Sequence, residues 1–137
     1  MGLILDTCIL IETERRGDGL EDILGRVRAV HGETDIALAA VSAVELTHGI
    51  YRATTEAIRF RRRAFVEGAL HDLIVHPLTA EIAQLAGRVE GEQAAKGNTL
   101  AFEDLLIGAT ALYLGFGVAT LNVRHFQAIP GLEVVTM

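Results

Sequence analysis

Three acidic residues lie close to the ends of apolar segments that are far apart in the sequence. Asp6 follows the apolar run 2–5, Glu45 comes shortly after the run 36–41, and Asp104 lies at the start of the helical pattern 102–114. Carboxylate oxygens are the ligands that Mg²⁺ and Mn²⁺ take in proteins. A cation held in this way can bridge a phosphate oxygen and activate a water molecule. If the three acids converge, they predict metal-assisted hydrolysis of a phosphodiester bond.

Asp6 and Glu45 each have a structural interpretation as well. Asp6 can cap a helix that begins near Cys8, although Thr7 could cap it equally well. Ser42 and Glu45 form the S-x-x-E pattern of a capping box, in which the glutamate accepts a hydrogen bond from the serine backbone N–H. Taken alone, this pattern favours capping over a ligand role for Glu45, because both roles use the same oxygens.

Glu103 and Asp104 both lie near the start of a predicted helix. Negative charge is favoured there by the helix dipole, by ~0.3–1 kcal/mol. Adjacent helical positions point about 100° apart, so only one of the two side chains can face a common site. Asp104 shares a helix face with Gly108 and Ala111, whose small side chains allow another element to approach closely. We therefore predict Asp104 as the site residue and Glu103 as its alternate.

Further polar residues surround the end of the apolar run 118–121. Thr120 and Asn122 stand at this strand end, and Arg124 is well placed to contact a phosphate. The basic run 59–63 is either a solvated helix face or a stripe that contacts phosphate or a dimer partner. The chain contains no C-x-x-C or H-E-x-x-H pattern, so a zinc site is not expected.

Short apolar segments alternate with longer helical patterns along the chain. The predicted strands are 2–5, 36–41, 73–75, 118–121 and 132–135, and the predicted helices are 20–30, 42–53, 55–70, 80–95 and 102–114. This alternation indicates an α/β fold with a mainly parallel central sheet. No linker, repeat or low-complexity segment interrupts residues 1–137, which predicts a single domain. Ligands of open parallel sheets bind beyond the carboxyl ends of the strands, where Asp6, Glu45 and Asn122 are expected.

Composition and charge narrow the class of protein. The 137 residues include 12 basic and 18 acidic side chains, which give a net charge of −6 and argue against a protein that coats DNA through positive charge. The only cysteine, Cys8, has no partner for an internal disulfide, and this fits a reducing compartment. We recognise no signal peptide, and no apolar stretch approaches ~20 residues. The expectation is a cytoplasmic protein without a membrane span.

The acidic residues belong to a longer pattern that runs through the chain. It reads Asp6-Thr7 after the first strand, then Ser42-Ala43-Val44-Glu45-Leu46, then residues 103–112 (EDLLIGATAL), residues 119–126 (ATLNVRHF) and the closing Ile129-Pro130-Gly131-Leu132. In this order and spacing the chain resembles the PIN-domain family over its whole length. More closely, it resembles the VapC-type toxins of bacterial and archaeal toxin–antitoxin pairs. The resemblance implies a PIN-like three-layer α/β/α sandwich and a Mg²⁺- or Mn²⁺-dependent endoribonuclease.

The resemblance also implies a role for individual residues. Asp6 and Asp104 match the direct metal ligands of the family, and Glu45 matches the acid that supports the metal directly or through water. Thr120 and Asn122 match the positions that hold a water molecule or a substrate phosphate. Our predicted catalytic residues are therefore Asp6, Glu45, Asp104 and Asn122. Our predicted substrate contacts are Thr7, Thr120 and Arg124.

Two positions depart from the family pattern. PIN nucleases often carry a fourth acid where this chain has Asn122, and many VapC-like sequences have an acid where this chain has His125. With fewer negative ligands, a second metal would bind less tightly. The resemblance further implies an RNA substrate, a cognate VapB-type antitoxin that blocks the site, and a homodimer. Two alternatives remain: a housekeeping PIN ribonuclease without an antitoxin, and a catalytically inactive PIN-like module that binds RNA or protein.

Overall fold

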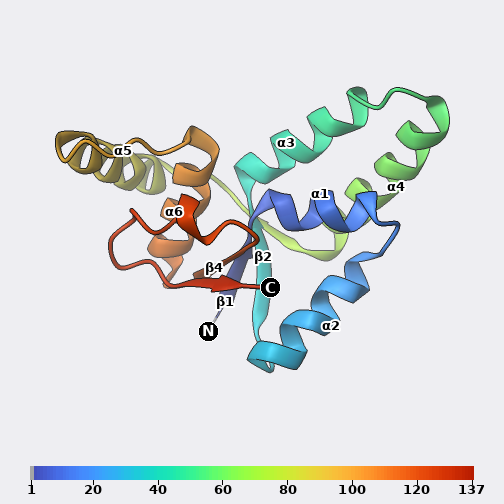
Figure 1. Cartoon of the computed structure of the whole chain (residues 1–137), viewed down its shortest axis with the longest axis horizontal. Coiled ribbons are helices and arrows are strands. Elements are labelled where there is room, and N and C mark those ends of the chain that lie inside the picture. The colour runs from blue at the N-terminus through green and yellow to red at the C-terminus, as the bar shows by residue number, and fades with distance from the viewer. Residues whose placement is uncertain (1) are drawn as a thin grey trace.

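The central sheet is built from short strands, and two neighbouring ones, residues 2–5 and 117–120, are buried along their whole length. The strands are β1 (Gly2–Leu5), β2 (Asp35–Ala39), β3 (Ile74–His76), β4 (Gly117–Thr120) and β5 (Val134–Thr136). The computed structural model describes residues 2–137. Within it, the strands are ordered β3-β2-β1-β4-β5 and all pairs are parallel (Figure 1). The predicted parallel sheet is thus confirmed, and every carboxyl end lies along one edge.

Helices cover both faces of this sheet (Figure 1). They are α1 (Thr7–Arg15), α2 (Leu20–His31), α3 (Ala40–Tyr51), α4 (Glu56–Asp72), α5 (Ala80–Ala95) and α6 (Phe102–Leu114). Successive side chains of a strand point to opposite faces. Leu3 and Leu5 of β1 accordingly join a core cluster with α1 to α4, whereas Ile4 joins a second cluster with α5 and α6. The predicted three-layer α/β/α sandwich is confirmed.

The predicted and observed elements differ mainly at their ends. The helices 80–95 and 102–114 are found as predicted, whereas β5 begins two residues after the predicted strand. The strand predicted over 36–41 ends at Ala39, and α3 begins directly at Ala40. Ala40 and Val41 are apolar and suit either element, and the N-cap residue Ala39 has no side chain that could mark a helix start. The segment after Asp6 forms α1, the helix expected to begin near Cys8, for which no range was predicted.

Close packing at α6 brings the chain after β4 onto the site. A short 3₁₀ helix, η1 (Val123–His125), follows β4. A Cβ atom added at Gly108 would overlap Cδ1 of Ile129, so the small residue allows this segment to pack onto α6. The packing places His125 beside Asp104 at the start of α6. In residues 2–137, no helix combines the length and the apolar character that a bilayer crossing requires.

Candidate functional site

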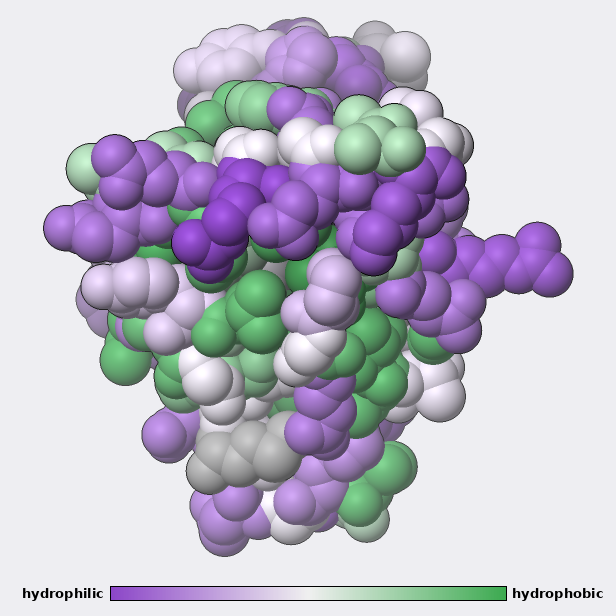
Figure 2. Space-filling model, turned by 90° about the vertical axis from the view of Figure 1, so that its left-hand side faces the viewer, coloured by the Kyte–Doolittle hydropathy of each residue, from purple (hydrophilic) through white to green (hydrophobic). Residues whose placement is uncertain are grey.

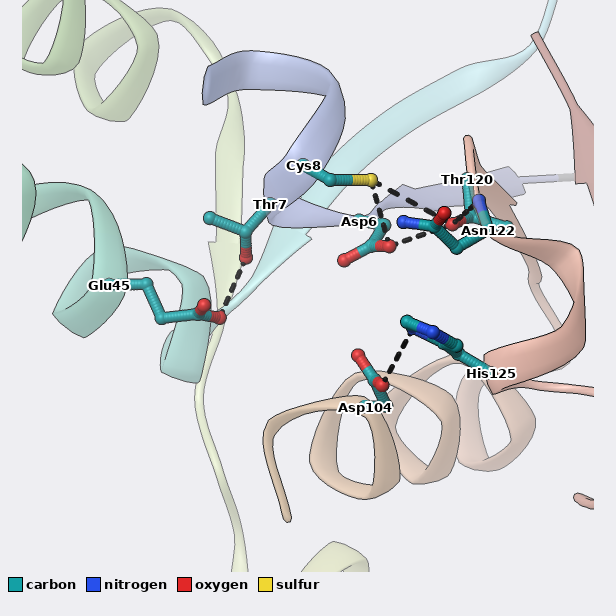
Figure 3. Close-up of polar contacts among 8 residues, drawn as sticks. All are labelled: Asp6, Thr7, Cys8, Glu45, Asp104, Thr120, Asn122 and His125. Atoms are coloured by element: carbon teal, nitrogen blue, oxygen red, sulfur yellow. Dashed lines mark hydrogen bonds and ion pairs between the residues drawn. The ribbon is translucent and has the colours of Figure 1, made fainter. Parts of the chain in front are cut away.

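Asp6 lies at the carboxyl end of β1, next to the end of β4. Its backbone N–H continues the sheet by donating to the carbonyl oxygen of Ala119 at 2.9 Å. Its carboxylate is 5% exposed, and Oδ2 accepts hydrogen bonds from Thr120 Oγ1 at 2.7 Å and from Cys8 Sγ at 3.0 Å (Figure 3). Asp6 occupies the N-cap position of α1, but its side chain makes no capping hydrogen bond. Its carboxylate is therefore oriented by site residues and not by the helix.

Glu45 is held by a contact between two helices. The hydroxyl of Thr7, at the start of α1, donates to Glu45 Oε1 at 2.9 Å and is hydrogen-bonded to Ser42 Oγ at 2.8 Å. The capping-box interpretation of Ser42 and Glu45 is wrong, because α3 begins two residues earlier and Ser42 lies in its first turn. Thr7 is only 2% exposed, so we interpret it as a residue that positions Glu45.

Asp104 lies opposite Asp6 across the site, in the first turn of α6 (Figure 3). Its Oδ2 is 3.3 Å from Nδ1 of His125, which comes from η1. The structure thus brings Asp6, Glu45 and Asp104 around one space although they are separated by much of the chain (Figure 3). His125, at the position where many VapC-like sequences have an acid, lies at the rim of the same space.

The other predicted residues line the β4 side. Thr120 is fully buried, and its hydroxyl both donates to Asp6 and accepts the backbone N–H of Asn122 at 2.9 Å. Because the hydroxyl is already used both as a donor and as an acceptor, we interpret Thr120 as a residue that positions Asp6. Asn122 and Arg124 are exposed to solvent at the edge of the site, where a substrate can reach them.

Burial and nearby negative charges raise the pKa of two of the site carboxyls, Glu45 and Asp104. Burial raises the pKa of Glu45, and the charges of Glu103, Asp6 and Asp104 raise it further, while the hydrogen bond from Thr7 lowers it. Burial and the charge of Asp6 likewise raise the pKa of Asp104, against the lowering effect of His125. These effects of neighbouring charges on the pKa require the acids to be close together. They are relieved when a cation binds between the acids.

The donor set fits a hard divalent cation. Oxygen ligands of negative charge suit Mg²⁺ and Mn²⁺. Among residues 2–137, no three side chains of His, Cys, Asp or Glu are gathered closely enough to ligate a single ion by themselves. This arrangement still suits Mg²⁺, because that ion usually takes one or two carboxylates and keeps several water molecules.

Cys8 near the site was missed as a functional candidate, whereas Glu103 had been considered. Cys8 donates to Asp6 Oδ2, and burial together with this hydrogen bond raises the pKa of its thiol to about 11, so that it stays protonated. Glu103, named above only as an alternate, adds negative charge beside Glu45 and Asp104. The position of Cys8 in the turn after Asp6 was the available sequence signal, but it does not show where the thiol points.

The basic run 59–63 does not form one stripe. Arg62 donates to Glu14 Oε1 at 2.6 Å and to the carbonyl oxygen of Gly49 at 2.7 Å, so it ties α4 to α1 and α3. Arg59 pairs with Glu56 and bonds the backbone of residue 53. Arg61 and Arg63 are exposed to solvent. At least Arg62 therefore serves the fold.

Comparisons with known proteins agree with this architecture. The PIN domain family matches residues 3–132. Ribonuclease VapC1 of Rickettsia felis is 31% identical over 137 residues, which cover 100% of this chain and 97% of that protein. The tRNA(fMet)-specific endonuclease VapC of Salmonella typhimurium is 32% identical over 94 residues, or 69% of this chain and 71% of that protein. A crystal structure of DNA-bound VapBC from Salmonella typhimurium matches with a TM-score of 0.83 and 26% identity, over 99% of this chain and 98% of that one.

Proposed function

Because this chain belongs to the PIN-domain family, as a VapC-type member, we propose that its acidic site hydrolyses RNA with Mg²⁺ or Mn²⁺ as the cofactor. The activity is that of an endoribonuclease toxin, and we propose that it acts on RNA in the cytoplasm. The observation that carries the metal dependence is the convergence of Asp6, Glu45 and Asp104, whose surroundings raise the pKa of the latter two. Acids that repel one another favour a bound cation.

Each residue of the site has a defined task in this proposal. Asp6 and Asp104 hold the metal directly, and Glu45 supports it directly or through a water molecule. The bound metal would supply an activated water and a Lewis acid for the phosphate. Thr120 and Cys8 fix the orientation of the Asp6 carboxylate by donating to its Oδ2. Asn122 and Arg124 are exposed at the edge of the site and bind the substrate phosphate.

We propose two protein partners for this chain. The matched Salmonella typhimurium structure is a VapBC assembly, and this supports a VapB-type antitoxin as the partner of this chain. We also propose a homodimer. Large apolar side chains stay exposed on α6, with Phe102 at 63% and Tyr113 at 53%, and a second copy could cover them. Figure 2 shows hydrophobic surface below a band of hydrophilic side chains on the end of the molecule that carries α5.

The test is cleavage of a broad RNA panel, transfer RNAs included, with Mg²⁺, with Mn²⁺ and with EDTA. We expect metal-dependent cutting that falls at least about a hundredfold in Asp104→Asn, because outer ligands alone already change metal-site activity by ~10–100-fold. Glu90→Gln, which changes an exposed acid of α5, is the matched control and should cut normally. Cutting that persists in EDTA would contradict a metal mechanism. Absence of both cutting and calorimetric Mn²⁺ binding would favour an inactive binding module.

A further inference from the structure

A hollow of about 350 Å³, lined by both polar and apolar residues, opens directly beside Asp104. One wall is the loop 97–101, which connects α5 to α6. The opposite wall is formed by Arg124 and His125 of η1 and by Ala128 just after it. The hollow therefore shares Asp104 with the acidic site and extends away from it between two segments that are distant in sequence. Its volume lies at the lower end of the ~300–1,000 Å³ range of small-molecule sites, which suits one nucleotide.

The loop wall is held in place by a buried side chain. Gln93 of α5 is 4% exposed, and its Oε1 accepts a hydrogen bond from Asn98 Nδ2 at 2.8 Å. The carbonyl oxygen of Gln93 also accepts the backbone N–H groups of Lys96 and Asn98, at 3.0 and 2.8 Å. Gly97 has a φ of +82°, a conformation that favours glycine, and completes the turn. The Asn98 amide is thus anchored to Gln93 by one N–H, while Asn98 itself lines the hollow.

Asn98 and Arg124 offer the hollow complementary chemistry. In the hydrogen bonds of residues 2–137, the Asn98 side chain uses only one N–H, so its second N–H and its Oδ1 can contact a ligand. Arg124 forms no ion pair within this part of the chain, and it is the only arginine or lysine that lines the hollow. An unpaired guanidinium binds a phosphate through two parallel hydrogen bonds. This cation matters in a chain whose net charge of −6 repels RNA as a whole.

We infer that this hollow is a nucleotide subsite for the RNA strand, next to the phosphate that is cut. Arg124 contacts the phosphate of the bound nucleotide, while Asn98 and Thr99 contact the edge of its base. Single-stranded RNA is read in this way, through hydrogen bonds to the edges of unstacked bases. The inference rests on the proposed function, because it takes the strand to pass over Asp104. It goes beyond that function by naming the residues that determine which base precedes or follows the cut.

The test combines cleavage mapping with direct binding. A random-sequence RNA pool is cut by the wild type, Asn98→Ala, Thr99→Val and Arg124→Ala with Mn²⁺, and the new ends are sequenced. We expect Asn98→Ala and Thr99→Val to relax the base preference at one position beside the cut. Arg124→Ala should lower kcat/KM about tenfold for all sequences alike, because a phosphate contact carries no base information. Arg88→Ala, an exposed arginine of α5 outside the hollow, is the matched control.

Binding of the same RNA in EDTA separates this inference from the proposed function. Fluorescence anisotropy with wild type and Arg124→Ala should show weaker binding and a smaller salt dependence for the variant. If the wild type cuts RNA but the hollow variants keep its base preference and its kcat/KM, the subsite is overturned and the nuclease stands. If nothing is cut but RNA binding still requires Arg124, the nuclease proposal fails and the subsite stands. If RNA does not bind at all, both fail.

Discussion

The fold treats the carboxylate of Glu14 differently from the carboxylates of the acidic site. Glu14 is 6% exposed and is bound by Arg62, whose Nε donates to Oε1 at 2.6 Å. Among the described residues 2–137, the only basic side chain paired with an acid of the site is His125, which contacts Asp104. The Glu14 charge is balanced within the chain, whereas the site keeps an excess of negative charge.

The presence or absence of a paired cationic side chain thus distinguishes a structural acid from a functional one. A buried carboxylate with a hydrogen-bonded guanidinium stabilises the contact between helices. Where carboxylates are gathered without a matching cation, burial and the neighbouring negative charges raise the pKa of an acid, as they do for Glu45 and Asp104. The fold tolerates that repulsion, and a divalent cation would relieve it. In the metal-free protein, removing the partner of Glu14 should therefore lower the stability of the fold. Neutralising an acid of the site should raise it.

The largest expected effect is the fall in the free energy of unfolding when the ion pair between Glu14 and Arg62 is broken. Arg62→Met keeps most of the apolar stem but leaves Glu14 buried without its partner and removes a donor from the carbonyl oxygen of Gly49. Breaking a buried ion pair on one side typically costs ~3–5 kcal/mol. The Arg62 side chain is 25% exposed, so we expect the lower end of that range, about 3 kcal/mol, in urea unfolding.

Two controls decide whether the pair itself is responsible. Arg61→Met changes an exposed neighbour and should shift the free energy of unfolding by less than about 0.5 kcal/mol. Replacing both partners, as Glu14→Leu with Arg62→Met, should restore much of the loss because no charge then remains unpaired. Equal losses for Arg61→Met and Arg62→Met would show that Glu14 needs no partner.

An intermediate effect on stability and on Mn²⁺ affinity is expected at Thr120, which orients the Asp6 carboxylate. Thr120→Val keeps the shape but removes the donor to Asp6 Oδ2 and the acceptor for the backbone N–H of Asn122. Unsatisfied buried groups cost ~1–3 kcal/mol. Loss of such an outer contact should also lower Mn²⁺ affinity by ~10–100-fold in calorimetry. Thr120→Ser keeps the hydroxyl and should restore both the stability and the Mn²⁺ affinity. A stability loss with unchanged Mn²⁺ affinity would mean that Thr120 does not orient a metal ligand.

Much of the fold could be predicted from the sequence because its signals are local. The helix 80–95 has a clear apolar period and an N-cap at Thr79, whose hydroxyl accepts the backbone N–H of Ile82, and both of its ends were predicted. The junction at Ala39 and Ala40 has no such signal, since the chain passes from strand to helix without a polar cap. The capping-box error at Ser42 follows from this, because a pattern that marks helix starts also occurs inside helices.

The site could be predicted only in part. Asp6 follows from the rule that polar residues at the carboxyl ends of parallel strands converge, whereas Asp104 was predicted from its helix face and from the resemblance to the PIN-domain family. The contacts that orient the acids do not follow from any local rule. The hydrogen bond from Thr7 to Glu45 spans 38 positions, and the one from Thr120 to Asp6 spans 114. Such contacts depend on helix placement and side-chain direction, and so the roles of Thr7, Thr120 and Cys8 emerged only in three dimensions.

The smallest expected effect is the relief of repulsion at Glu45. The pKa of this carboxyl is raised in the folded protein, so protonation favours the folded state and the benefit is lost as the pH rises through the folded pKa. Glu45→Gln removes the charge but keeps an acceptor for Thr7. In EDTA at pH 7 we expect a gain of about 0.5 kcal/mol, the size of a like-charge contact in a partly exposed setting. The gain should shrink towards pH 4, where Glu45 of the wild type is also protonated. Glu90→Gln, at an exposed position, should show no such trend, and matching profiles for the two variants would mean that the acids of the site do not repel one another.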